Sequence, residues 1–193
     1  ASAKKYGLKV GIYYSPADSY MEKKGVWGNN SARVERTIPT LVENDDRADK
    51  VASGKLPTFK YKATDYGAYM LNQLYELLTE YGDISEVWFD GAQGNTAGTE
   101  HYDYGVFYEM IRRLQPQAIP ANAAYDARWV GNEDGWARQT EWSPQAAYND
   151  GVDKVSLKPG QMAADGKLGS MSSVLSEIRS GAANQLHWYP AEV

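Results

Sequence analysis

Asp90 and Trp88 are the residues of this sequence whose types and spacing best fit chemistry on a sugar. They close the apolar run 84–90 and lie two positions apart, so in a strand both side chains lie on the same face. A carboxylate there could attack an anomeric carbon or stabilise an oxocarbenium ion, while the indole packs against a pyranose. The competing interpretation is an Asp that caps the turn through Gly91, because Asp-Gly is a common turn pair.

A retaining glycosidase would need a second carboxyl about 5 Å from the first, to act as an acid and then as a base. Two segments mix carboxylates with Trp and Arg: residues 128–135 contain Glu133, and residues 138–143 contain Glu141. The adjacent Trp residues could supply the apolar surroundings that a protonated acid needs. For either glutamate taken alone, a solvated loop carboxylate is the more common outcome.

Other kinds of catalytic site find little support in the sequence. The chain has no cysteine, which excludes a disulfide framework, a thiolate metal site and a thiol nucleophile. Its two histidines, His101 and His187, are too isolated to suggest a metal site. A Gly-x-Ser-x-Gly motif is absent, and so is a Gly-x-Gly-x-x-Gly dinucleotide motif. We therefore expect chemistry without a metal or cofactor.

Composition and charge describe an ordinary globular chain. Of its 193 residues, 42% are hydrophobic and 23% are charged, which is enough apolar material for a core. The net charge of −5 argues against a nucleic-acid partner, because such binders concentrate Lys and Arg. No apolar run approaches the ~20 residues that a membrane helix needs, so we expect no membrane association through a spanning segment.

Two amphipathic helices are expected on either side of the run 84–90. The first begins at a cap near Thr64 and ends before Gly82, and the second begins near Asp103 and is stopped by Pro116. The apolar stripe of the first helix follows the helical period. Its members are Tyr66, Met70, Leu74, Leu77, Leu78 and Tyr81.

The other expected elements are shorter. Residues 8–15 are β-branched and aromatic and predict a buried strand. Residues 17–62 are polar and charged, and we expect them to form a long insertion at one rim of the fold. A weak strand is expected over 118–124, a short helix before Gly181, and a strand over 185–189.

This alternation of strands and helices predicts an α/β fold with parallel strands, part of a (β/α)8 TIM-like barrel. In such barrels the chemistry lies at the carboxyl ends of the strands. Those ends are aromatic here, at 13–15, 88–90 and 188–190, and one of them carries Asp90.

Six segments, taken in order, resemble a known family: the α-L-fucosidases of glycoside hydrolase family twenty-nine. The most specific is Glu86-Val87-Trp88-Phe89-Asp90-Gly91-Ala92, which follows a Leu-rich helix and Tyr81-Gly82. The other segments are 7–16, 72–82, 128–133, 140–143 and 188–193.

The resemblance implies that Asp90 is the nucleophile of a retaining exo-α-L-fucosidase. It makes Glu133 the preferred acid/base, with Glu141 as the reserve candidate. The residues that it implies for substrate binding are Tyr13, Trp88, Arg128, Trp129 and Glu141. The segments around Glu133 and Glu141 are similar to the branch that acts on α-1,3/1,4-linked fucose, so fucosylated oligosaccharides or glycoconjugates are the expected substrates.

The family's catalytic domains are longer, and a preceding strand there ends in paired histidines that this chain lacks. We therefore expect residues 1–193 to be a partial barrel domain, truncated at both ends relative to the family, with the rest of the barrel and a C-terminal β-sandwich elsewhere. The resemblance also implies a secreted or periplasmic protein. The alternatives are a carbohydrate-binding or inactive barrel fragment, or another retaining glycosidase or transfucosylase.

Overall fold

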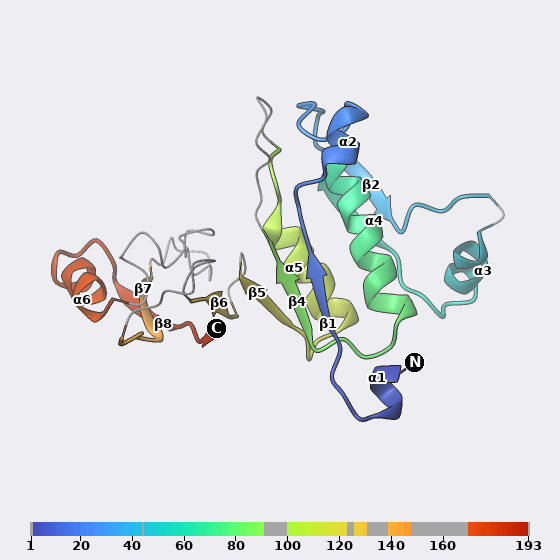
Figure 1. Ribbon diagram of the computed structural model, residues 1–193. Helices are drawn as coiled ribbons and strands as arrows, with labels where there is room; N and C mark the ends of the chain where they lie inside the picture. Colours follow the sequence, from blue (N-terminus) through green and yellow to red (C-terminus); the bar gives the residue numbers. More distant parts are fainter. Residues whose placement is uncertain are drawn as a thin grey trace. The chain divides into compact units, whose positions relative to one another are not determined.

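The computed structural model describes residues 2–43, 45–90, 100–122, 126–130, 139–147 and 170–192 (Figure 1). The chain divides into two compact units, Ala1–Ala118 and Ile119–Val193, and each is described by itself.

Two parallel strands and two helices form the centre of the first unit. Strand β1, Gly11–Tyr14, pairs in parallel with β4, Glu86–Phe89. Phe89 of β4 is fully buried and its ring contacts three aromatic rings of helix α5, Tyr104–Leu114. Strand–helix packing of this kind is expected of an α/β protein.

Helix α4, Asp65–Glu80, confirms the prediction for this segment. Thr64 is its N-cap, and the hydroxyl accepts a hydrogen bond from the Gly67 N–H. Tyr81 lies beyond the end of the helix and is 61% exposed, so its expected place in the apolar stripe was wrong. The residues that α4 buries are Tyr66, Met70, Leu71, Leu74, Tyr75 and Leu78.

Helix α5 also begins and ends as predicted, between Asp103 and Pro116. The strand expected over 8–15 is shorter, since β1 covers only Gly11–Tyr14. Leu8 and Tyr13 are largely exposed, so the prediction of a buried strand was wrong except at Tyr14.

The polar segment 17–62 is more regular than expected. It contains helices α2, Ser19–Lys23, and α3, Asp46–Ala52. It also contains strand β2, Val34–Ile38, which pairs antiparallel with β3, Phe59–Ala63. In β3, Phe59, Tyr61 and Ala63 are buried and alternate with exposed lysines, the pattern of a half-buried strand. The short helix α1, Ser2–Lys5, precedes β1.

The second unit contains helix α6, Met171–Arg179, and five short strands. Strand β6, Arg128–Trp129, pairs in parallel with β9, Ala191–Glu192. Strand β7, Pro144–Ala147, pairs antiparallel with β8, Gln185–Trp188. Strand β5, Ile119–Asn122, carries a bridge from Ala121 to Ala127.

The expectation of parallel strands alternating with helices is therefore only partly confirmed. The pairs β1–β4 and β6–β9 are parallel, whereas β2–β3 and β7–β8 are antiparallel. The apolar pattern of one strand does not show whether the neighbouring strand runs parallel or antiparallel to it. Short connections allow the antiparallel arrangement. Within the described ranges the α/β chain has parallel pairs but no closed barrel. No helix in the described part of the chain combines the length and the apolar character needed to cross a bilayer.

Candidate active site

The parallel register of β1 and β4 places two aromatic rings together at the carboxyl ends of the strands. Tyr13 is the register partner of Trp88. Their rings stack with centroids 5.7 Å apart and an interplanar angle of 16°. The Tyr13 side chain is exposed, so these stacked rings offer a flat apolar surface of the kind that packs against a sugar.

Asp90 directly follows β4 and joins this aromatic pair. Its N–H donates to the Tyr14 carbonyl oxygen at 3.0 Å, which extends the pairing of β1 and β4 by one residue. Its Oδ2 accepts a hydrogen bond from the Tyr13 hydroxyl. The structure thus brings together three residues selected from the sequence. Gly91, on which the turn-cap interpretation depends, lies outside the described residues.

Two tyrosine hydroxyls connect the carboxyl end of β1 to helix α4. Tyr14 donates to Gln73 Oε1 at 2.5 Å, and Tyr66 donates to the Pro16 carbonyl oxygen at 2.6 Å. Burial, and secondarily the negative electrostatic surroundings, raise the pKa of the Tyr14 hydroxyl well above its ordinary value. Burial raises the pKa of the Tyr66 hydroxyl as well, so both hydroxyls remain protonated donors and fix the end of β1 to helix α4.

In the second unit, Arg128 and Glu141 form an ion pair. The Arg128 Nη1 lies 3.2 Å from Glu141 Oε2, and the Arg128 side chain is only 2% exposed. Arg128 Nη2 donates to the Trp142 carbonyl oxygen at 3.4 Å, and the Arg128 N–H donates to that of Pro190 at 2.9 Å. The pair therefore ties the Glu141 carboxylate to strand β6. Trp129, the next residue, is half-buried.

Glu133, the preferred acid/base, lies outside the described residues. The sequence did not indicate the hydrogen bond from Tyr13 to Asp90 or the pairing of Arg128 with Glu141. The feature of the sequence that bears on the contact between Tyr13 and Asp90 is that both strands have aromatic carboxyl ends. Those ends meet only if the two strands pair in parallel. Among the described residues, no group of three or more His, Asp or Glu side chains is arranged to hold a metal ion.

A family model described as alpha-L-fucosidase matches residues 1–152. The chain belongs to the alpha-L-fucosidase family. Alpha-L-fucosidase 1 of Arabidopsis thaliana is 42% identical over 83 residues, which is 42% of this chain and 16% of the plant protein. This chain therefore spans about a sixth of the length of that curated relative.

Solved structures agree with the family. The crystal structure of a candidate alpha-L-fucosidase from Bacteroides ovatus ATCC 8483 has 31% identity and a TM-score of 0.57, and covers 100% of this chain and 27% of that one. A fucosidase of glycoside hydrolase family 29 from Ruminococcus gnavus, solved in complex with fucose, has 22% identity and a TM-score of 0.50. It covers 80% of this chain and 28% of that chain, and at this identity shows a shared fold alone.

Proposed function

We propose that the protein carrying this chain is a retaining exo-α-L-fucosidase whose nucleophile is Asp90. The observation that supports this most is the grouping of Asp90, Tyr13 and Trp88 at the carboxyl ends of two parallel strands. Active sites of (β/α)8 barrels lie at that end of the strands, and we propose that residues 1–193 are part of such a barrel. Membership of the alpha-L-fucosidase family supports fucose as the sugar.

In the proposed reaction, an Asp90 carboxylate oxygen attacks the anomeric carbon of fucose while Glu133 protonates the leaving glycosidic oxygen. The carbon–oxygen bond to the aglycone breaks and a fucosyl-aspartate forms. Glu133, now a carboxylate, then removes a proton from water, and the hydroxide displaces Asp90. Two inversions leave the anomeric configuration unchanged.

The remaining assignments follow from the same scheme. The Tyr13–Trp88 stack packs against the fucose ring, and the Tyr13 hydroxyl orients the Asp90 carboxylate. Arg128, Trp129 and Glu141 bind substrate, with Arg128 fixing the Glu141 carboxylate. The substrates are glycans with terminal α-1,3- or α-1,4-linked fucose. This linkage is supported by the similarity of the segments around Glu133 and Glu141 to that branch.

Azide rescue tests the nucleophile. Asp90→Ala in the whole protein should abolish hydrolysis of an aryl α-fucoside, and azide should restore turnover by attacking in place of the carboxylate to give the β-fucosyl azide. Asp83→Ala, which removes an exposed aspartate just before β4, is the matched control and should keep full activity. Full activity in Asp90→Ala would refute the assignment.

The acid/base is tested in the same way. With an activated aryl fucoside, azide should accelerate Glu133→Ala and give the α-fucosyl azide, because it attacks the fucosyl-aspartate. Glu141→Ala should show no such rescue. Rescue of Glu141→Ala with the α-azide product would transfer the role from Glu133 to Glu141.

A further inference from the structure

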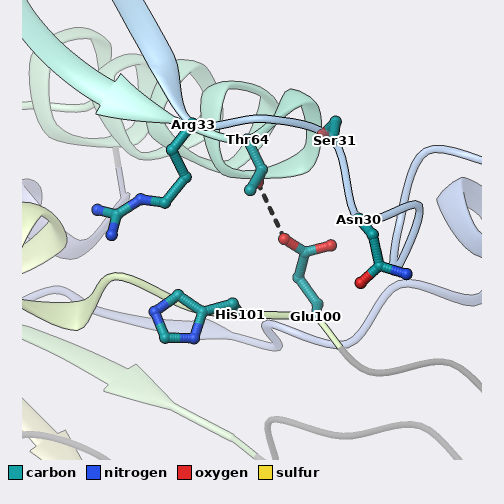
Figure 2. Close-up of a pocket in the computed structure, with 6 residues that line it drawn as sticks. All are labelled: Asn30, Ser31, Arg33, Thr64, Glu100 and His101. Carbon is teal, nitrogen blue, oxygen red and sulfur yellow. Dashed lines mark hydrogen bonds between the residues drawn. The ribbon is translucent and has the colours of Figure 1, made fainter.

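A polar pocket of about 400 Å³ lies in the first unit (Figure 2). Its volume is in the range of small-ligand sites, roughly 300–1,000 Å³. Among the described residues, three segments line it: the loop after α2, the N-cap of α4 and the stretch before α5. Its lining residues are Asn30, Ser31, Arg33, Thr64, Glu100 and His101.

A hydrogen bond connects the chain segment that carries Glu100 to the end of β1, where the proposed fucose site lies. The Tyr102 hydroxyl donates to the Pro16 carbonyl oxygen at 3.0 Å, two residues beyond β1. The same hydroxyl accepts from Trp27 Nε1 at 2.7 Å. These contacts join the wall that carries Glu100 to the carboxyl end of β1. Asp90, Tyr13 and Trp88 are not among the lining residues, so this pocket is a separate site.

Glu100 forms the fixed inner wall of the pocket. The residue is only 6% exposed, and described donors from two other segments hold its carboxylate. The Thr64 hydroxyl donates to Oε1 at 2.9 Å, and the Gly28 N–H donates to Oε2 at 2.7 Å. Figure 2 shows this carboxylate between Thr64 and Asn30, with Arg33 and His101 farther along the pocket. A buried carboxylate held in this way is a preorganised acceptor, because it cannot turn away from a ligand.

The neighbouring loop is also held in an unusual conformation. Asn30 has a φ of 54°, in the left-handed region that asparagine adopts more readily than most residues other than glycine. Asn29 Oδ1 accepts from the Ser31 N–H at 2.9 Å, and the Ser31 hydroxyl accepts from the Asp65 N–H at 2.9 Å. These contacts hold the loop in one conformation beside Glu100.

The charges of the pocket indicate a neutral ligand. Arg33 is paired with Asp103, so an anionic ligand would have to displace that carboxylate and would also face Glu100. The other lining groups are an amide, two hydroxyls and an imidazole, which together donate and accept hydrogen bonds. No Phe, Tyr or Trp ring is among the described lining residues, so binding would depend on hydrogen bonds to hydroxyl groups.

We propose that this pocket binds a second, neutral pyranose of the fucosylated glycan, through hydrogen bonds from its hydroxyls to Glu100, Asn30 and His101. The proposal rests on the fucosidase function above and identifies where the part of the substrate beyond fucose is recognised. It predicts that the pocket contributes to hydrolysis of oligosaccharides and not of aryl fucosides, which lack a second sugar.

The test compares two substrates in the whole protein: an aryl α-fucoside and a fucosylated trisaccharide. Asn30→Gly removes the amide and keeps the positive φ accessible. Glu100→Gln keeps the shape and removes the charge. Each variant should lower kcat/KM for the trisaccharide about tenfold, the effect of losing one hydrogen bond of roughly 1.4 kcal/mol, and leave the aryl fucoside unchanged. Glu35→Gln, an exposed carboxylate on β2, is the matched control and should change neither substrate.

The outcomes separate this proposal from the proposed function. Equal kcat/KM for the trisaccharide in the wild type and both pocket variants would overturn the pocket proposal alone. If the wild-type protein hydrolysed neither substrate, the fucosidase function would fail, and saturation-transfer NMR with methyl galactoside and methyl N-acetylglucosaminide would test the pocket directly. A signal lost in Asn30→Gly would support the site, and no signal in the wild type would refute it.

Discussion

At the scale of single residues, Asp90 is positioned by contacts from a strand that lies far from it in the sequence. The backbone of Tyr14 accepts from its N–H, and the hydroxyl of Tyr13 donates to its carboxylate. The Tyr13 ring is held in turn by Trp88. The Tyr13 hydroxyl is therefore one contact that orients the carboxylate, and it can be removed without removing the ring.

Tyr13→Phe keeps the stack on Trp88 and removes the donor to Asp90. We expect kcat/KM for an aryl α-fucoside to fall about tenfold, because a hydrogen bond to a charged group contributes about 1.5–3 kcal/mol and this one is solvent-exposed. The melting temperature should stay close to that of the wild type. Tyr6→Phe, at an exposed tyrosine before β1, is the control. Wild-type kinetics in Tyr13→Phe would show that its hydroxyl has no part in orienting Asp90.

At the scale of elements, the N-terminus of α4 joins the helix to the pocket. Thr64 accepts from the first turn of α4 through its hydroxyl and donates to Glu100 with the same group. The Asp65 N–H, the next along the chain, donates to Ser31. One hydroxyl thus both caps the helix and fixes the buried carboxylate.

Thr64→Ala should destabilise the whole protein by about 1–2 kcal/mol, the upper part of the range for losing a cap residue, because the Glu100 carboxylate loses a donor at the same time. The measurement is the free energy of unfolding from urea titration. Thr64→Ser retains the hydroxyl and should recover most of the loss. Equal stability of Thr64→Ala and the wild type would mean that this hydroxyl is replaced by water at no cost.

At the scale of the whole molecule, buried tyrosines make the fold sensitive to alkali. Burial raises the pKa of Tyr102 to about 12 and moves those of Tyr14, Tyr66 and Tyr104 farther upward. In the unfolded chain these hydroxyls ionise near their ordinary pKa of 10. Above that pH the folded state binds more protons than the unfolded state, so its stability decreases as the pH rises.

The stability that these tyrosines contribute should therefore be fully present below about pH 10 and should be lost progressively as the pH rises above it. Urea titrations at pH 8.5, 10 and 11.5, at about the same ionic strength, would measure this. Tyr102→Phe should be less stable at pH 8.5 and show a shallower fall, because one shifted group is gone. Tyr20→Phe, at an exposed tyrosine of α2, is the control and should keep the wild-type slope. If the free energy of unfolding of Tyr102→Phe fell with pH as steeply as that of the wild type, Tyr102 would not be one of the groups whose pKa is raised by folding.

The sequence by itself determined helices α4 and α5 and the composition of the candidate site. Caps, apolar stripes and stop residues set the bounds of α4 and α5, because these signals act within a few residues of one another. The same local reasoning placed Trp88 and Asp90 on one face at the end of a strand. It did not anticipate β2 and β3, because charged residues interrupt their apolar positions.

Only the tertiary structure decided which strands pair and what their ends bring together. The hydroxyl of Tyr13 reaches Asp90 because β1 and β4 are parallel and in a register that sets Tyr13 beside Trp88. The carboxylate of Glu100 is buried because segments distant in the sequence close around it. Strand pairing and burial are properties of contacts between distant segments, and no pattern within one segment specifies its partner.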